Sequence, residues 1–351
     1  MGNDFNIVVF DPLTAAEDLW TAHYDHLDEI SRELDPEEPL LPREKRRAML
    51  VSAQSIPYAH KYYYLLTNAG GVAAGYGSIV TETPKSPTYE ANKAVANLKL
   101  SVLPGHRRKG LGSRLLKHLV AEMALKEPAL KEFICPVMTE PGVKFMDKAG
   151  GKVSLEHAEN RLCLKDLDWA LVEDWAAKGA QRNPAAVMVN TTVIPEADIK
   201  AYCDLYSETI NQQPLGGLAV TMKITPEQIR LGEEKNREAG AEHTTVYAKE
   251  AGGICGLTEA YYMKETGHRV LQMLTGVRAA SRGRGLGKLL KALMLLHIRA
   301  KHPEVKYIVT GNADSNAPMI AINNRLGFKR HRSVHLYKLK TADLRPPKTA
   351  V

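Results

Sequence analysis

Two glycine-rich, basic segments hold the residue types and spacings in this sequence that could do chemistry. One is VRAASRGRGLGK at residues 277–288, and an altered copy, VLPGHRRKGLGS, stands at residues 102–113. Their first residues, Val277 and Val102, are 175 residues apart in a chain of 351. Each segment follows an apolar, β-prone run and precedes an apolar-periodic helix. Such a turn can bind phosphate, because glycines permit close backbone approach and the first amides of a helix are free donors.

The elements that must position these turns recur in the same order in both halves. For the first half we predict helices at 13–32, 42–53 and 111–126 and strands at 62–66, 72–80, 97–102 and 133–138. The matching set in the second half is helices at 195–210, 226–239 and 286–301 and strands at 244–248, 254–263, 270–277 and 307–310. A further helix and a final strand pair are expected to end each half. A connecting helix at 166–178 and a linker at 179–184 would join them.

This order predicts an α/β fold with two tandem domains, each a mixed, mostly antiparallel sheet flanked by helices. The expected boundaries are residues 1–168 for the first domain, 169–184 for the linker, 185–340 for the second domain and 341–351 for a tail. The length fits this division, since a typical domain has roughly 100 to 200 residues.

Composition narrows the class of protein. The chain is 44% apolar and 25% charged, which excludes a disordered or fibrous protein. It shows neither a leader nor an apolar run of about 18 residues, so we expect a cytoplasmic protein without a membrane partner. The net charge of +7 favours an anionic ligand, but the charge is spread along the chain and does not indicate nucleic acid. The four cysteines lack metal-ligand spacing, and no metal is predicted.

Three phosphate-binding patterns compete for the glycine segments. A dinucleotide fingerprint needs G-x-G-x-x-G within a βαβ unit, whereas Gly283, Gly285 and Gly287 alternate and helices precede them. A nucleotide P-loop needs Gly-Lys followed by Ser or Thr, but Lys288 is followed by Leu289. What remains in both copies is Arg-x-x-Gly-x-Gly after a strand that ends in valine.

The remaining pattern resembles the acetyl-CoA pyrophosphate loop of the GNAT superfamily of N-acetyltransferases. The second half also has the asparagine and the Gly-Phe pair that such proteins carry downstream, at Asn316 and Gly327-Phe328, although Asn323 stands where a tyrosine is usual. In the first half Thr139 and Met146 replace the asparagine and the tyrosine. The resemblance covers both halves and indicates a tandem type, with a degenerate first domain and a catalytic second one.

Acetyl-CoA is the cofactor that the resemblance implies. In the second half the expected cofactor-binding residues are Thr275, Val277, Arg282, Gly283, Arg284, Gly285, Leu286, Gly287, Lys288 and Asn316. In the first half they are Leu100, Val102, Arg107, Arg108, Lys109, Gly110, Leu111, Gly112 and Ser113.

The implied reaction is direct attack of a primary amine, from a small molecule or a peptide, on the acetyl thioester. Glu259, a charged residue in an apolar strand, is the candidate base, with Asp314 or His268 as alternatives. Because the usual tyrosine is missing, Tyr337 is a candidate proton donor to the thiolate, and Tyr261, Tyr262 or water are the alternatives. A different class of function stays open: a protein that binds or senses acyl-CoA without turnover.

Overall fold

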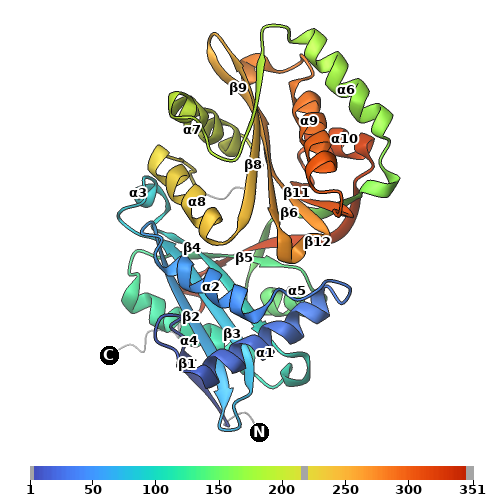
Figure 1. Cartoon of the computed structure of the whole chain (residues 1–351). Helices are drawn as coiled ribbons and strands as arrows, with labels where there is room; N and C mark the ends of the chain where they lie inside the picture. Colours follow the sequence, from blue (N-terminus) through green and yellow to red (C-terminus); the bar gives the residue numbers. More distant parts are fainter. Residues whose placement is uncertain (1–3, 215–219, 345–351) are drawn as a thin grey trace. The chain divides into compact units, whose positions relative to one another are not determined.

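The structure is a computed structural model that describes residues 4–214 and 220–344 (Figure 1). These residues form two compact units. The first comprises residues 4–154, 220 and 335–344, and the second comprises residues 155–214 and 221–334. The expected boundaries at 168 and 185 differ from this division, because residues 155–168 belong to the second unit and residues 335–340 to the first.

The first half of the chain begins with a strand, two helices and a β-hairpin. Its elements are β1 (Phe5–Val9), α1 (Glu17–Leu34), α2 (Arg43–Gln54), β2 (Ala59–Asn68), β3 (Ala73–Glu82), α3 (Tyr89–Asn92), β4 (Val95–Val102), α4 (Leu111–Lys126), β5 (Glu132–Val137), α5 (Glu140–Lys148) and β6 (Lys152–Cys163). The predicted helix at 111–126 is confirmed at both ends.

The second half repeats this order after the connecting helix α6. Its elements are α6 (Trp169–Arg182), β7 (Val187–Thr191), α7 (Glu196–Asn211), α8 (Pro226–Glu238), β8 (Ala241–Glu250), β9 (Gly253–Met263), β10 (Arg269–Val277), α9 (Leu286–Lys301), β11 (Tyr307–Ala313), α10 (Ala317–Leu326), β12 (Lys329–Lys340) and α11 (Thr341–Leu344).

The two units have sheets of the same topology. In the first unit the strand order is β1-β2-β3-β4-β5-β12, and every neighbouring pair is antiparallel except β4 and β5. In the second unit the order is β7-β8-β9-β10-β11-β6, and again the fourth and fifth strands alone are parallel. The predicted fold class, a mixed and mostly antiparallel sheet flanked by helices, is confirmed.

The sixth strand of each unit comes from the other half of the chain. Residues His157–Cys163 of β6 pair with β11 in the second unit, and His335–Lys340 of β12 pair with β5 in the first. The final strand pair expected within each half is therefore wrong, since each half supplies one long strand instead. Strands pair through backbone groups that every residue carries, so a repeated sequence does not specify which copy completes which sheet.

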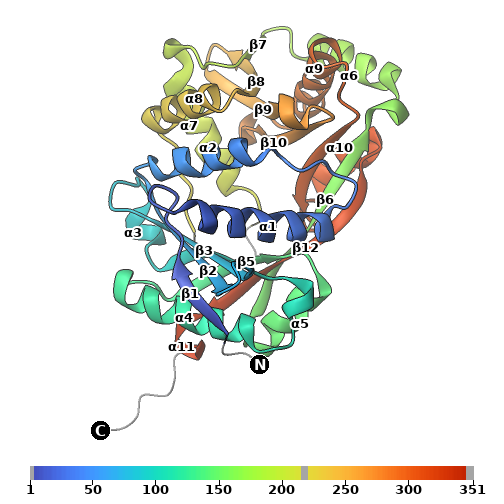
Figure 2. The same cartoon turned by 60° about the horizontal axis from the view of Figure 1, so that its bottom comes forward.

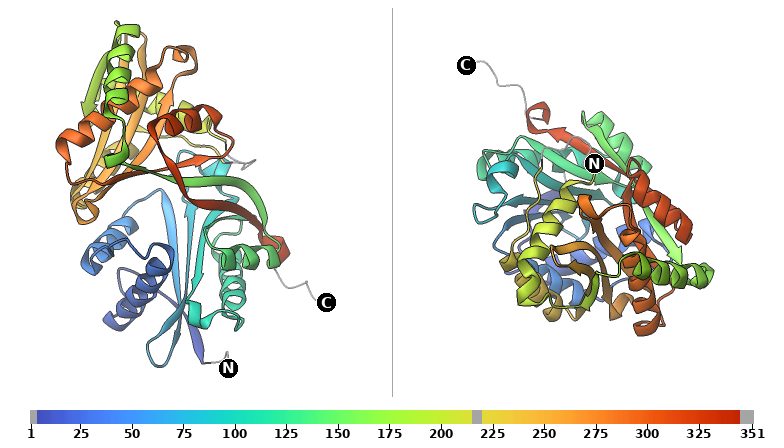
Figure 3. Two further views of the ribbon diagram at one scale, coloured as in Figure 1. Left: turned by 90° about the vertical axis from the view of Figure 1, so that its right-hand side faces the viewer. Right: turned by 90° about the horizontal axis from the view of Figure 1, so that it is seen from above.

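Helices cover both faces of each sheet. In the first unit, α1 packs Trp20 and Tyr24 against Tyr63 and Leu65, while α4 packs its leucines on the opposite face (Figures 2 and 3). In the second unit, α7 covers one face and α9, with α6 outside it, covers the other (Figure 1). The alternation of strand residues explains both layers, because successive side chains point to opposite faces.

The linker predicted at 179–184 is largely wrong, because α6 continues to Arg182. Gly179, taken from the sequence as a helix breaker, lies inside the helix and against α9. A Cβ atom on Gly179 would stand 2.7 Å from Cβ of Leu289. Gly179 thus permits close packing of α6 on α9, a role that a glycine inside a helix can have without ending the helix.

Replacing Gly179 with alanine is therefore expected to destabilise the protein. The added methyl group would force α6 from Leu289, and overpacking of this kind typically costs ~1–3 kcal/mol. Gly232 in α8 is the matched control, because a Cβ there would meet nothing within 4 Å, so Gly232→Ala should stabilise its helix by up to ~1 kcal/mol. Urea unfolding of both variants tests the pair, and equal effects would contradict the packing role of Gly179.

Candidate functional site

Both glycine turns adopt the same backbone conformation. In the second unit Gly283 and Gly285 have φ angles of +81° and +83°, and in the first unit Arg108 and Gly110 have +62° and +79°. Among the described residues, Arg108 is the one non-glycine with positive φ. The first turn therefore has the same positive φ angles as the second, although Arg108 stands where the second turn has Gly283.

Replacing Arg108 with glycine should raise the free energy of unfolding. A left-handed conformation costs an ordinary residue ~1–2 kcal/mol, and glycine removes this cost. Glycine also raises the conformational entropy of the unfolded chain, which offsets part of the stabilisation. We expect a net stabilisation of about 0.5–1 kcal/mol in urea unfolding. Lys109→Gly, at a neighbouring residue without positive φ, should instead destabilise the chain, and the same sign for both variants would refute the strain.

The first arginine of each turn holds the turn against the end of its strand. Nε of Arg107 donates to the Val102 carbonyl at 2.9 Å, and Nε of Arg282 donates to the Val277 carbonyl at 3.2 Å. Both outer nitrogens of Arg107 also donate to Glu33, at 2.6 and 2.5 Å, and one outer nitrogen of Arg282 donates to Oε1 of Gln212. These two arginines thus support the turn from within.

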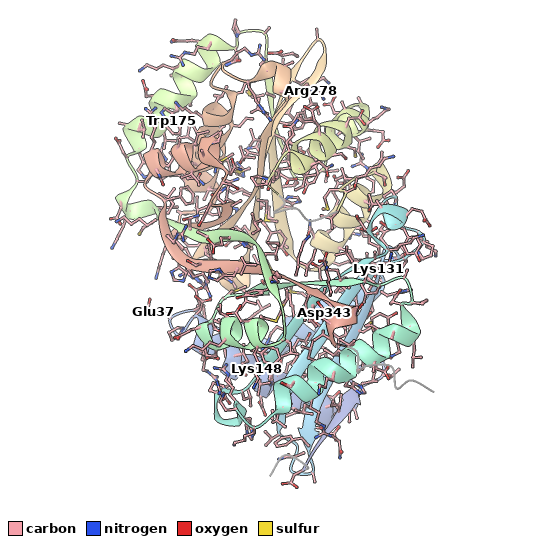
Figure 4. The ribbon with its side chains drawn as sticks, turned by 180° about the vertical axis from the view of Figure 1, so that it is seen from behind. Glu37, Lys131, Lys148, Trp175, Arg278 and Asp343 are labelled. Atoms are coloured by element: carbon pink, nitrogen blue, oxygen red, sulfur yellow. The ribbon has the colours of Figure 1, made fainter. Side chains whose placement is uncertain are left out.

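The other cations of the second turn also have partners. Arg284 lies 2.9 Å from Glu250, and the ammonium of Lys288 lies 5.4 Å from the ring centre of Trp175. Figure 4 labels Trp175, which lies on α6. Arg278, which follows β10, lies 3.3 Å from Glu208. Backbone amides at the start of α9 are therefore donors that remain for an anion, and binding of one at this turn stays a prediction.

The parallel strands of each unit separate as they approach the turn. In the first unit β4 pairs with β5 over Val95–Asn97, and in the second β10 pairs with β11 over Arg269–Gln272. Beyond these residues, 98–102 and 273–277 have no register partner on that side among the described strands. The backbone edge at Leu100, Val102, Thr275 and Val277 is thus open to an extended ligand.

A β-bulge distinguishes the second unit from the first. In β10, Gln272 pairs with Ala260 and Thr275 pairs with Thr258, so two residues, Met273 and Leu274, face the single residue Glu259. The corresponding stretch of β4 pairs with β3 without any shift of register. A bulge leaves backbone groups outside the ladder and often redirects the chain at an active site.

Glu259 lies opposite this bulge and is almost fully buried, at 2% exposure. Its carboxylate accepts a hydrogen bond from the hydroxyl group of Tyr202 and lies 3.4 Å from Nε2 of His243. Burial raises the pKa of the Glu259 carboxyl, and His243 and Tyr202 oppose that rise. A buried carboxylate with a raised pKa is suited to accept a proton near neutral pH.

The first unit has no carboxylate at the matching place. Gly256 pairs with Val277 and Gly75 pairs with Val102, so three residues further along the strand Ser78 of the first unit corresponds to Glu259. Ser78 is buried at 5% exposure. Both the bulge and the acid are thus confined to the second unit.

Asn316 caps helix α10, as its position after β11 suggests. Its Oδ1 accepts the Met319 amide at 3.4 Å, and Thr139 caps α5 in the same way through the Gly142 amide at 3.3 Å. In the place of the usual tyrosine, Asn323 is buried and donates to Asn312 at 2.6 Å. Contact of Asn316 with a cofactor stays a prediction.

Tyr337, the candidate proton donor, lies on the last strand, β12, in the part that belongs to the first unit. It pairs with Cys135 of β5, is 1% exposed in the core of the first unit, and donates its hydroxyl proton to Asp147 at 2.8 Å. The strand exchange explains this placement, because the end of β12 belongs to the first unit. Tyr337 is a core residue there, and its role as a proton donor stays a prediction.

A basic run, residues 329–332, follows α10, and its first three residues line a cavity of about 290 Å³. The lining includes Arg161, Tyr307, Lys329 and Arg330. Arg330 donates a hydrogen bond to the carboxylate of Asp314 at 2.7 Å. Asp314, one of the alternative candidate bases, is therefore paired with an arginine. Because β11 is parallel to β10, Tyr307 lies at the end of the strands opposite the glycine turn, whereas Asp314 follows the other end of β11.

Tyr202, His243 and Gln272 are site residues that sequence reasoning did not find. Gln272 donates its amide to the Glu259 carbonyl at 2.6 Å and to Thr258 Oγ1 at 3.0 Å, which bridges the bulge. A buried carboxylate must have hydrogen-bond donors, but nothing in the sequence says which elements supply them. The apolar spacing of α7 indicates only that Tyr202 faces the core.

Comparison with known proteins identifies the architecture. Residues 20–149 match the model of the acetyltransferase (GNAT) family. No curated protein matches the chain. Among solved structures, a tandem GNAT protein from the clavulanic acid biosynthesis pathway is similar with a TM-score of 0.73 and 19% identity, over 96% of this chain and 98% of that one. The chain has the tandem GNAT fold.

Two further structures share features of this tandem GNAT fold. A GCN5-related N-acetyltransferase from Sphaerobacter thermophilus is similar with a TM-score of 0.64 and 16% identity, over 98% of this chain and 97% of its own. A glucosamine N-acetyltransferase region of a fungal multi-domain β-N-acetylglucosaminidase is similar with a TM-score of 0.61 and 15% identity, over 95% of this chain and 38% of that protein.

The resemblance drawn from the two glycine turns is confirmed at the level of the fold. The match falls within the first unit, which is the half that the sequence analysis expects to be degenerate. No helix among residues 4–214 and 220–344 of this tandem GNAT fold is long and apolar enough to cross a membrane.

Proposed function

We propose that the chain is an acetyl-CoA-dependent N-acetyltransferase and that transfer takes place in the second unit. The acceptor is a primary amine of a small molecule or peptide. The observation that carries this proposal is the bulge of β10, which lies opposite the buried Glu259 and beside the open strand edge. The four cysteines are free, in agreement with the reducing cytoplasm.

Space at both turns supports coenzyme A as the ligand. A Cβ atom on Gly110 or Gly283 would meet nothing within 4 Å, so each turn leaves space over its backbone amides. In the second unit the turn Arg282–Gly287 would hold the pyrophosphate and the edge Thr275–Val277 the pantetheine amides. Arg107–Gly112 and Leu100–Val102 are the equivalents in the first unit.

Acetyl-CoA, when bound, supplies an activated acetyl group as a thioester. Backbone amides at the bulge are positioned to donate to a carbonyl oxygen on which negative charge develops. Glu259 takes the proton that the acceptor amine must lose, and its raised pKa improves it as a base. His243, whose side chain is 32% exposed, links Glu259 to solvent. With Asn323 in the tyrosine position, we assign protonation of the thiolate to water.

Release of free thiol from acetyl-CoA against a panel of primary amines tests this function. We expect amine-dependent release from the wild-type chain, together with a product that is heavier by one acetyl group. The panel should include diamines, amino sugars and short peptides. Release that does not depend on any amine, or none at all, would refute N-acetyl transfer.

A second function is favoured by one observation. The positions at which the family carries a tyrosine hold Asn323 and Met146, both buried, so neither unit has the usual acid. A chain that binds acyl-CoA without turnover would need only the turns and the open strand edges. Calorimetric binding of acetyl-CoA combined with no thiol release for any amine would select this alternative.

A further inference from the structure

We infer that helix α6 is part of the second cofactor site and that Arg182, at its end, binds the pyrophosphate of coenzyme A. The sequence indicates only a connector at this place. The inference rests on the proposed function, because it names a further residue for the same site. Three observations on the second unit support it.

The end of α6 is fixed to the glycine turn. Asn183, which follows the helix, is 3% exposed. Its side-chain nitrogen Nδ2 donates to the Gly179 carbonyl at 2.8 Å and to the Arg284 carbonyl at 3.2 Å. One turn earlier Gly179 packs directly on Leu289 of α9. Arg182, which directly precedes Asn183, is therefore held beside the turn.

The guanidinium of Arg182 stands over the start of α9. Its NH1 nitrogen lies 3.8 Å from the position that a Cβ atom would take on Gly285. The structure of residues 4–214 and 220–344 gives the Arg182 side chain no ion pair or hydrogen bond, whereas Arg282 and Arg284 in the turn contact Gln212 and Glu250. Arg182 is thus an available cation beside the helix N-terminus.

This arrangement suits a phosphate group. A guanidinium presents paired N–H donors that match phosphate oxygens, and the first amides of α9 approach the same place from the helix. The first unit lacks the feature, since the equivalent position on Gly110 has no atom within 4 Å. The second site should therefore bind coenzyme A more tightly than the first.

Calorimetric titration with coenzyme A and with 3′-dephospho-coenzyme A tests the role of Arg182. A Gly110→Val background blocks the first turn, so that the second site is measured alone. We expect Arg182→Ala to weaken binding of both ligands about 10-fold to 100-fold, as for loss of a charge-assisted hydrogen bond. Arg182→Lys should recover part of the loss. Lys178→Ala, which removes a charge from the same helix, should bind as the background does.

Each other outcome has a definite meaning. Unchanged binding by Arg182→Ala would overturn the inference and leave the proposed function intact. Weaker binding of coenzyme A alone would assign Arg182 to the 3′-phosphate and overturn the pyrophosphate assignment. If the wild-type chain binds neither ligand, the proposed function fails and the inference with it. The Arg182 side chain is exposed, so its replacement should not change the melting temperature. Equal melting temperatures of the wild-type chain and the Arg182 variants would show that all of the titrated proteins are folded.

Discussion

Replacing Gly285 with valine is expected to abolish acetyl transfer while the chain stays folded. Gly285 is the N-cap of α9 and has a φ angle of +83°, a region that β-branched residues avoid. The turn would have to move, and a displacement of about one ångström can cost about 100-fold in rate. The measurement is kcat/KM for thiol release with an amine that the wild-type chain acetylates.

The matched control is Gly110→Val. Gly110 is the N-cap of α4 and has a φ angle of +79°, so valine there meets the same backbone strain, but in the first unit. Most of the activity should remain, because the bulge and Glu259 belong to the second unit. If activity instead collapses for Gly110→Val and survives for Gly285→Val, transfer takes place in the unit that carries the family match.

Replacing Glu259 with glutamine should lower kcat by about 100-fold to 10,000-fold, the usual contribution of a general base. The amide keeps the size of the side chain and can still accept from Tyr202, so folding should be preserved. Glu234→Gln, on the exposed face of α8, is the control for a lost carboxylate in the same unit. Near-wild-type kcat for Glu259→Gln would exclude Glu259 as the base.

The raised pKa of Glu259 also predicts two pH effects. Activity requires the carboxylate, so the acidic limb of the kcat profile should lie above the ordinary carboxyl pKa. The stability of the fold should change with pH in the opposite sense to activity. The folded state binds the proton of Glu259 more tightly than the unfolded state does, so this proton contributes its full stabilisation below the pKa of the unfolded state. That stabilisation is lost as the pH rises through the pKa of Glu259 in the folded state. Glu259→Gln should lack that loss, and urea unfolding at several pH values measures the difference.

Local signals explain how much of the fold could be predicted from the sequence. The helices that follow the glycine turns were predicted with the observed bounds, 111–126 and 286–301. In each case a left-handed glycine starts the helix and a proline follows its end, and both effects act on neighbouring residues. The apolar periodicity between these points fixes the buried face, and the parallel order of elements predicts two similar sheets.

The parts that were missed depend on residues far apart in the chain. Gly179 appears to be a breaker until Leu289 of α9 is known to pack on it. Tyr337 was assigned to the second unit because β12 follows the second repeat, yet its end pairs with β5. The donors to Glu259 come from α7 and β8, and no spacing links them to β9. Long-range pairing of this kind has no local signature.

The exchange of the sixth strands also governs when the protein can fold during synthesis. The first unit needs residues 335–340, which the ribosome adds after the whole second unit. Until then β5 presents an unpaired edge, the kind of surface on which chains associate wrongly. The N-terminal unit therefore cannot finish folding first, as such units generally do. A ribosome-bound chain that stops before residue 335 should remain sensitive to protease at β5.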